Sequence, residues 1–178
     1  MPRVVAIIQA RLSSTRLPNK VLMNICGKPM LERVIEKVRK SKLIDTMAVA
    51  SPHPIVCSTN KFIGDEEDVL KRYYDCATHF MADTVVRITS DCPLLDPEII
   101  DYAIRFFKRT KLRYVYFAPV DGLDVEVFTY ELLKEAHQKA TKKFDREHVT
   151  PYMKRVTKIS VDTLEELNKV RRIYEMGR

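Results

Sequence analysis

Apolar residues along this chain fall into two kinds of pattern. Residues 4–8 form an uninterrupted, largely β-branched run, which predicts a strand buried on both faces of a sheet. Between Met30 and Val38 the apolar residues recur every three or four positions with charged residues between them, which predicts an amphipathic helix. The two patterns then alternate, and we expect further strands at 47–50, 85–89, 112–118, 125–128 and 158–161 and further helices at 65–80, 96–107, 129–142 and 163–175.

Three segments lack a clear period. Residues 21–24 are expected to form a short extended piece after a polar loop. Residues 51–61 contain two prolines and are expected to be a loop, with at most a short strand at 55–57. Residues 146–153 are expected to be a short helical or irregular segment that is broken near Pro151.

Strands that alternate with helices of about 10–15 residues are typical of parallel βαβ units. We therefore expect an α/β fold, a three-layer α/β/α sandwich around a mostly parallel, Rossmann-like sheet. A chain of 178 residues is near the size that one hydrophobic core serves, so a single domain over residues 1–178 is expected. Because ligands bind at the carboxyl ends of the strands in such sheets, functional residues are expected just after the strands.

Composition excludes several classes of protein. Hydrophobic residues make up 46% and charged residues 31% of the chain, as in ordinary soluble proteins. No stretch approaches the roughly 18 consecutive apolar residues of a membrane span, and the run at 4–8 is too short for a signal peptide. We therefore expect a cytoplasmic protein with no membrane partner. The four widely spaced cysteines argue against a zinc site and against a secreted disulfide framework.

The formal net charge of +7 suits a polyanionic partner, either a nucleoside triphosphate or a nucleic acid. The basic residues are scattered, however, with no run of five and no interleaving with aromatic residues. The charge pattern therefore does not favour nucleic-acid binding, and most of the excess charge is expected on a solvated surface.

The loop after the first strand carries three cations, Arg11, Arg16 and Lys20, with small hydroxyl residues between them. Arginine forks, a lysine charge and backbone N–H groups together suit a loop wrapped around phosphates. The loop lacks the glycines and the Gly-Lys-Ser/Thr ending of a Walker A motif, and it contains no G-x-G-x-x-G. From the residues alone, a phosphate-binding loop and an ordinary basic surface loop are equally supported.

Asp91 follows the predicted strand at 85–89, at the edge of the sheet where ligands are expected. A carboxylate there can hold Mg²⁺, which prefers one or two protein carboxylates together with phosphate oxygens and water. The alternative is that Asp91 only caps the turn before Pro93. The sequence leaves both interpretations open.

The first loop and the segment after it form a long motif, IIQARLSSTRLPNKVL followed by GKPMLERVIEKV. This motif resembles the opening of the cytidylyltransferases that activate acidic sugars, among them the acylneuraminate and 3-deoxy-manno-octulosonate cytidylyltransferases. The resemblance is greatest to the branch of spore coat polysaccharide biosynthesis protein F. It implies a nucleotide-diphospho-sugar transferase-like fold and an enzyme that transfers CMP from CTP to an acidic or related sugar. It also implies release of pyrophosphate, a need for Mg²⁺ and a role in cell-surface polysaccharide synthesis.

The resemblance also implies roles for single residues. Many relatives have glycine where this chain has Asn19, which implies a positive φ that asparagine tolerates. The residues expected to take part directly in catalysis are Arg11, Lys20 and Asp91. The residues expected around the nucleotide, the last two of them at its triphosphate, are Ala10, Arg11, Ser14, Arg16 and Lys20.

Two acidic segments match the family's metal motifs. D-C-P-L at 91–94 matches the family's D-x-P-L, which implies that Asp91 is a metal ligand. V-D-T at 161–163 resembles the family's second acidic site, which implies that Asp162 is the second ligand. Asp162 also precedes a well-capped predicted helix, and that structural role is the alternative.

Two further segments, D-G-L-D-V-E-V-F at 121–128 and R-E-H-V-T-P-Y at 146–152, occur at matching places in the same branch. Taken by themselves, they are also consistent with turn chemistry and with a buried, salt-bridged corner. The resemblance implies that they line the pocket of the sugar acceptor through Asp124, Glu126, Arg146 and His148.

The chain is shorter than longer relatives of this family at 51–64, 118–121 and 153–159. The first of these regions normally helps to recognise the base, so CTP follows from the resemblance and not from residues of this chain. A shortened hairpin leaves homodimer formation open. Two alternative functions remain: a nucleotidyltransferase that uses another nucleotide, and a trimmed nucleotide-binding domain without turnover.

Overall fold

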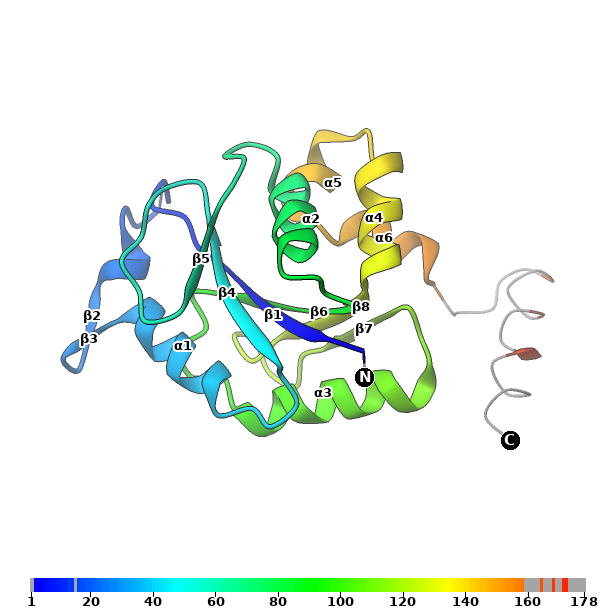
Figure 1. Cartoon of the computed structure of the whole chain (residues 1–178), viewed down its shortest axis with the longest axis horizontal. Helices are drawn as coiled ribbons and strands as arrows, with labels where there is room; N and C mark the ends of the chain where they lie inside the picture. The colour runs from blue at the N-terminus through cyan, green and yellow to red at the C-terminus, as the bar shows by residue number, and fades with distance from the viewer. Residues whose placement is uncertain (1, 15, 159–163, 165–167, 169–170, 173–178) are drawn as a thin grey trace.

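The structure is a computed structural model, and it describes residues 2–14, 16–158, 164, 168 and 171–172. At its centre lies a six-stranded sheet with helices on both faces (Figure 1). From one edge to the other the strands are β5 (Asn60–Ile63), β4 (Thr46–Ser51), β1 (Val4–Gln9), β6 (Thr84–Thr89), β8 (Val125–Thr129) and β7 (Tyr114–Phe117).

The sheet is mostly parallel. β5, β4, β1 and β6 run in the same direction, whereas β8 is antiparallel to both β6 and β7. β7 and β8 pair in this way because only a short turn joins them, and Gly122 in that turn has a φ of 83°. The expected three-layer α/β/α sandwich around a mostly parallel sheet is confirmed.

Helices cover both faces of the sheet. The alternating side chains of β1 serve two separate cores, with Val4 and Ile8 on one face and Val5 and Ile7 on the other. This double burial explains the uninterrupted apolar run at 4–8. One face carries α1 (Met30–Arg39) and α3 (Pro97–Thr110), and the other carries α2 (Val69–His79), α4 (Tyr130–Lys139), α5 (Lys143–His148) and α6 (Pro151–Val156) (Figure 1).

Capping side chains fix the starts of three helices. Asp68, Asp96 and Thr129 each accept a backbone N–H from the first turn of α2, α3 and α4 respectively. The predicted helix starts at Asp96 and Thr129 are therefore confirmed. The segment at 146–153 is divided near Pro151 into α5 and α6, also as predicted.

The prediction of a short extended piece at 21–24 is wrong. Lys20–Leu22 forms a 3₁₀ turn (η1), and a small hairpin of β2 (Asn24–Ile25) and β3 (Lys28–Pro29) follows it. Asn19 enters the turn with a φ of 56°, so the expected positive φ is confirmed. The Leu22 N–H donates to the Asn19 carbonyl (2.9 Å), which curls the chain instead of extending it.

A strand also lies where none was predicted. Residues 55–57 form no strand, and β5 follows them and pairs in parallel with β4. The side-chain amide of Asn60 holds the start of β5 in place by donating to the Met47 carbonyl (3.0 Å). β5 is a largely exposed edge strand, so it lacks the apolar run by which buried strands are recognised.

The predicted strand at 158–161 lies, apart from its first residue, outside the described residues, as does Asp162. Most of the predicted helix at 163–175 lies outside them as well, so these elements stay predictions. Within the described part of the chain, no helix combines the length and the apolar character needed to cross a membrane.

Candidate active site

Two neighbouring strands end side by side at the carboxyl edge of the sheet. β1 and β6 finish at Gln9 and Thr89, which are paired in register. Just beyond them, the Ser90 N–H donates to the Gln9 carbonyl (3.1 Å), and the Ala10 N–H donates to a carbonyl of β4 (3.1 Å). The first loop and the segment that carries Asp91 therefore leave the sheet next to each other.

Lys20 and Asp91, both predicted to be catalytic, form an ion pair across this edge. Lys20 Nζ lies 2.5 Å from Asp91 Oδ2, and both side chains remain partly exposed. Burial would raise the pKa of Asp91, but hydrogen bonds from Lys20 and Thr89 outweigh burial and hold the pKa below its usual value. Asp91 is therefore an ionised carboxylate that solvent can reach.

The first loop folds back around the Leu12 carbonyl, which accepts the Ser14 N–H (2.9 Å). Ala10 is buried at the base of the loop. Arg11 and Arg16 are exposed, and neither guanidinium is paired with a carboxylate in the described part of the chain. Their donors are available to phosphate oxygens.

Asp124 immediately precedes β8, which runs antiparallel beside β6, so Asp124 lies near the end of β6. Burial raises the pKa of the Cys92 thiol, and the negative charges of Asp124, Asp91 and Asp121 raise it further. Carboxylate oxygens are the ligands that Mg²⁺ prefers. No group of three or more metal-ligating side chains forms among the described residues. Mg²⁺ requires only one or two protein carboxylates when phosphate completes its shell, so the donors present fit this ion.

Glu126 lies deeper, with almost no exposed surface. Its Oε2 lies 2.5 Å from Arg87 Nη1, and its Oε1 accepts hydrogen bonds from Tyr114 (2.6 Å) and Thr150 (2.9 Å) and lies 3.1 Å from Lys154 Nζ. Burial would raise the pKa of Glu126, but the charges and donors around it lower the pKa instead. The structure therefore places Glu126 in an internal network and leaves neither oxygen unpartnered.

Arg87 connects this network to the first loop. Its Nη2 donates to the Gln9 side chain (3.3 Å), and Gln9 directly precedes the loop. Arg87 also lies over the ring of Tyr73, at 5.9 Å from the ring centroid. A change at Glu126 can therefore affect the base of the first loop through Arg87 and Gln9.

Thr150 reaches Glu126 by way of a strained turn. Val149 has φ 68° and ψ −57°, and the Thr150 N–H donates to the His148 carbonyl (2.8 Å), which together define a γ-turn. Such a conformation costs of order 1–3 kcal/mol in a residue other than glycine. The side chain of Val149 is fully buried, and its burial stabilises the strained turn.

Arg146 and His148, the remaining predicted acceptor residues, lie in a different environment. Arg146 binds Asp68 through Nε (2.7 Å) and Nη2 (2.6 Å), and its Nη1 donates to the carbonyls of His137 (3.1 Å) and Ala140 (2.9 Å). This is the salt-bridged corner that the sequence left open as the alternative. His148 is exposed and packs against Phe144, and no described contact joins it or Arg146 to Asp91 or Lys20.

Sequence reasoning did not identify Arg87, Thr150 or Lys154. A signal existed for Arg87, because a charged residue within the apolar strand VVRIT must find a buried partner. Lys154 gave no such signal, since it lies among other basic residues on a short helix and its contact with Glu126 depends on tertiary structure.

The chain is similar to known proteins along almost its whole length. A family model described as cytidylyltransferase matches residues 5–174. An uncharacterized protein from Methanocaldococcus jannaschii is 39% identical over 162 residues, which cover 85% of this chain and 67% of that protein. Spore coat polysaccharide biosynthesis protein SpsF from Bacillus subtilis is 28% identical over 211 residues, covering 98% of this chain and 88% of SpsF. The 3-deoxy-manno-octulosonate cytidylyltransferase of Geobacter sulfurreducens is 33% identical over 109 residues, covering 57% of this chain and 44% of that enzyme.

The fold agrees with the sequence match. A solved cytidylyltransferase from Leptospira borgpetersenii superposes with a TM-score of 0.80 at 25% identity, over 94% of this chain and 84% of that chain. The family indicated by the first loop is the one that these matches identify. This chain belongs to the cytidylyltransferase family and is a nucleotidyltransferase.

Proposed function

We propose that this chain transfers CMP from CTP to a hydroxyl group of an acidic or related sugar, in a Mg²⁺-dependent reaction that releases pyrophosphate. The observation that carries the proposal is the Lys20–Asp91 pair. It brings a cation suited to phosphate and a carboxylate suited to metal together where β1 and β6 end. Membership of the cytidylyltransferase family supports the choice of nucleotide.

The first loop is suited to hold the triphosphate. Arg11 and Arg16 offer exposed guanidinium groups, and the Lys20 ammonium can exchange Asp91 for a phosphate oxygen. We propose that Ala10 and Ser14 lie beside the nucleotide at the base of the same loop. Bound Mg²⁺ would be held by the carboxylate that Lys20 releases, and it would neutralise charge on the phosphates.

In the reaction, a sugar hydroxyl oxygen attacks the α-phosphorus in line with the bond to pyrophosphate. The new P–O bond forms as the bond to the pyrophosphate oxygen breaks, and the hydroxyl proton is released. Positioning and charge neutralisation supply most of the catalysis in such transfers. None of the described residues at this edge is placed as a general base, so the proposed roles of Arg11, Lys20 and Asp91 are electrostatic.

On the acceptor side we propose that Asp124 contacts the sugar, since it lies where β8 meets the end of β6. Glu126 and Arg146 are proposed to support the wall of the acceptor pocket through their ion pairs with Arg87 and Asp68. The exposed His148 is proposed to lie at the rim of that pocket. An acidic acceptor is supported by the name of one relative, a 3-deoxy-manno-octulosonate cytidylyltransferase. A role in polysaccharide synthesis is supported by the name of another, a spore coat polysaccharide biosynthesis protein.

Three further proposals rest on the sequence and on its resemblance to the family rather than on geometry. Asp162 is proposed as the second Mg²⁺ ligand. Residues 1–178 are proposed to act as one nucleotidyltransferase domain. A homodimer is the proposed assembly, and light scattering of the purified chain measures it.

Calorimetric binding of CTP, UTP, ATP and GTP, with and without Mg²⁺, tests the proposal on the wild type and on Asp91→Ala. We expect CTP to bind most tightly, and the binding to weaken without metal and in Asp91→Ala. Preference for another nucleotide would favour a different nucleotidyl transfer on the same fold. If CTP binds but no pyrophosphate is released in the presence of sugar acids, the result would favour a nucleotide-binding domain without turnover. If no nucleotide binds under any condition, the proposal is wrong.

A further inference from the structure

The Lys20 ammonium occupies the carboxylate that is proposed to hold Mg²⁺. Lys20 Nζ lies 2.5 Å from Asp91 Oδ2, and no other carboxylate in the described part of the chain lies within ion-pair distance of Lys20. Arg11 and Arg16, the other two cations of the first loop, are exposed and do not pair with Asp91. Lys20 is therefore the loop cation that covers Asp91.

The main chain on both sides of this pair is held in place. Lys20 begins the 3₁₀ turn η1, and Val21, the next residue, is almost completely buried. Ser90 and Cys92 flank Asp91 and are buried as well, and Val21 and Cys92 belong to the same core. The pair can therefore open by rotation of the flexible lysine side chain, without movement of either segment.

A nucleotide can open the pair. The Lys20 side chain is 26% exposed and the Asp91 side chain 43%, and ion pairs with this much exposure contribute little to stability. A triphosphate carries several negative charges, so it attracts an ammonium more strongly than a single carboxylate does. The exposed guanidinium groups of Arg11 and Arg16 can bind phosphate before Lys20 leaves Asp91.

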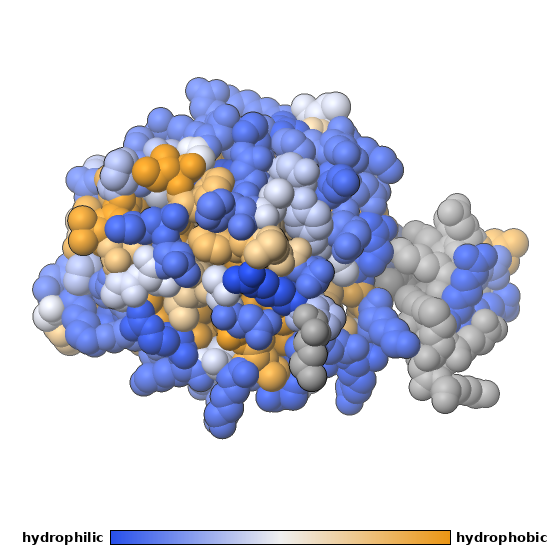
Figure 2. All heavy atoms as spheres, viewed as in Figure 1, coloured by the Kyte–Doolittle hydropathy of each residue, from blue (hydrophilic) through white to orange (hydrophobic). Residues whose placement is uncertain are grey.

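Without phosphate, Lys20 has no other anion to bind. Leu17 and Leu22, close to Lys20 in the chain, are exposed apolar residues. Figure 2 shows apolar surface among the polar side chains at the end of the molecule that carries the first loop. Asp91 is therefore the partner to which Lys20 returns when phosphate leaves.

A metal ion and the Lys20 ammonium compete for Asp91. Mg²⁺ binds a carboxylate oxygen at about 2.1 Å, and the ammonium lies 2.5 Å from Asp91 Oδ2. Two cations that share one carboxylate also repel each other, because the exposed site screens their charges only in part. A divalent ion must therefore displace Lys20, or bind after another ligand has displaced it.

We propose that Lys20 blocks the metal site of the free protein, so that a divalent ion binds Asp91 only after the nucleotide phosphates have drawn Lys20 away. This inference rests on the proposed function and adds the order in which its ligands bind. When pyrophosphate leaves, Lys20 returns to Asp91 and displaces the ion. The metal therefore enters with the nucleotide and leaves with the product, and nucleotide and metal strengthen each other's binding.

Binding of Mn²⁺ in the absence of nucleotide tests the inference. Mn²⁺ prefers oxygen ligands in an octahedral arrangement, as Mg²⁺ does, and the electron paramagnetic resonance signal of unbound Mn²⁺ measures how much the full chain has bound. Lys20→Met keeps a long side chain but removes the charge. We expect it to bind Mn²⁺ about tenfold more tightly than the wild type does. Adding Asp91→Asn to Lys20→Met should abolish this gain.

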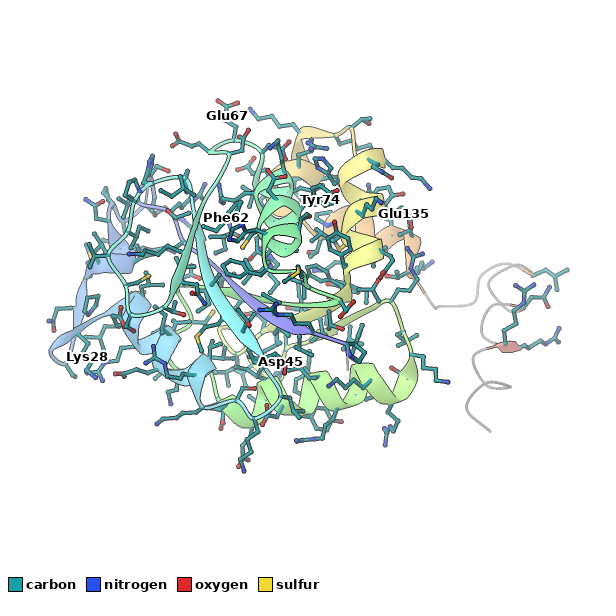
Figure 3. All side chains as sticks on the ribbon, in the orientation of Figure 1. Lys28, Asp45, Phe62, Glu67, Tyr74 and Glu135 are labelled. Carbon is teal, nitrogen blue, oxygen red and sulfur yellow. The ribbon has the colours of Figure 1, made fainter. Side chains whose placement is uncertain are left out.

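Lys28→Met is the matched control, because it also removes one paired lysine. Lys28 pairs with Glu36 of α1, and Figure 3 shows Lys28 at the outer end of the hairpin of β2 and β3. We expect Lys28→Met to bind Mn²⁺ as the wild type does. A gain equal to that of Lys20→Met would assign the effect to net charge and overturn the inference.

A second measurement uses the wild type alone. Tight Mn²⁺ binding by the nucleotide-free wild type, equal to that of its CTP complex, would overturn the inference without any variant. Equal Mn²⁺ binding by the wild type and Lys20→Met would also overturn it, while the proposed function would stand if CTP binding still requires Mg²⁺. If the wild type binds no nucleotide, both fail. Thermal melting checks that each variant folds, and Lys20→Gln replaces Lys20→Met if the latter does not.

Discussion

Glu126 keeps its negative charge inside the protein because donors surround both of its oxygens. Two of these donors are cations, Arg87 and Lys154. We predict that Glu126→Gln, which removes the charge and keeps the shape, leaves these cations without their counter-charge. The free energy of unfolding should fall by about 3–5 kcal/mol, the usual cost of breaking a buried ion pair. Urea denaturation followed by circular dichroism measures the change.

A surface ion pair provides the matched control for Glu126. Asp75→Asn breaks the i,i+4 pair between Lys71 and Asp75, and it should lower the free energy of unfolding by less than about 0.5 kcal/mol. Similar losses in Glu126→Gln and Asp75→Asn would contradict the assignment of Glu126 as a buried structural anion.

The same carboxylate gives the stability a pH dependence. Burial alone would raise the pKa of Glu126, but Arg87, Tyr114 and Lys154 hold the pKa below its usual value. A group whose pKa falls on folding contributes stability above its unfolded pKa, and that contribution is lost as the pH falls through the folded pKa. Wild-type stability should therefore decline below about pH 4.5, and less steeply in Glu126→Gln. Parallel profiles of the two proteins would refute this.

Asp68 acts at the scale of whole elements because it joins two helices. Its Oδ1 accepts the Lys71 N–H at the start of α2 (2.9 Å), and its Oδ2 accepts Arg146 Nε of α5 (2.7 Å). Asp68→Ala removes both interactions and should lower the free energy of unfolding by about 2 kcal/mol. Asp68→Asn keeps the cap and should cost about half as much. Guanidinium chloride denaturation measures both changes.

A helix cap without an ion pair separates the two contributions of Asp68. Asp96 accepts the Glu98 N–H at the start of α3 (2.9 Å), and Asp96→Ala should cost about 1 kcal/mol. If Asp68→Ala costs no more than Asp96→Ala, the bond to Arg146 contributes nothing to stability, and Arg146 becomes available again as an acceptor-binding residue.

Elements with a buried apolar face could be predicted from the sequence, and those without one could not. The run at 4–8 and the spacing from Met30 to Val38 identified β1 and α1, because each pattern follows from burial against the sheet. β5 is an exposed edge strand, and its position depends on the contact between Asn60 and β4. The 3₁₀ turn after Asn19 depends on a positive φ, which apolar spacing does not encode.

At the scale of the whole molecule, the sequence predicted the two segments that meet at the candidate site but not the ion pairs buried behind them. The basic loop and Asp91 were identifiable because each directly follows a recognisable strand. Arg87 and Glu126 are 39 residues apart, and their pairing depends on the register between β6 and β8. Nothing in the sequence singled out Arg72, because a buried guanidinium whose Nε and Nη2 lack partners in the described part of the chain is visible only in three dimensions.

The proposed metal site tests whether distant parts of the chain act together, since Asp91 follows β6 and Asp162 lies beyond α6. If both hold Mg²⁺ on the triphosphate, Asp162→Ala should lower turnover about 100-fold, a typical loss when one charge-stabilising group is removed. It should also raise the Mg²⁺ concentration needed for tight CTP binding. Binding without metal should be unchanged, because the first loop stays intact. Pyrophosphate release and calorimetric Mg²⁺ titration of the CTP complex measure these effects.

Glu165→Ala is the control for Asp162, because it removes a carboxylate three residues away in the same segment and should leave both measurements unchanged. An equal defect in Glu165→Ala would assign the effect to the local structure of that segment. A full Mg²⁺ response in Asp162→Ala would show that Asp91 and the phosphates hold the ion without it. In that case the proposed nucleotide site would be complete at Asp91, just after β6, and the residues beyond α6 would be free to serve the acceptor.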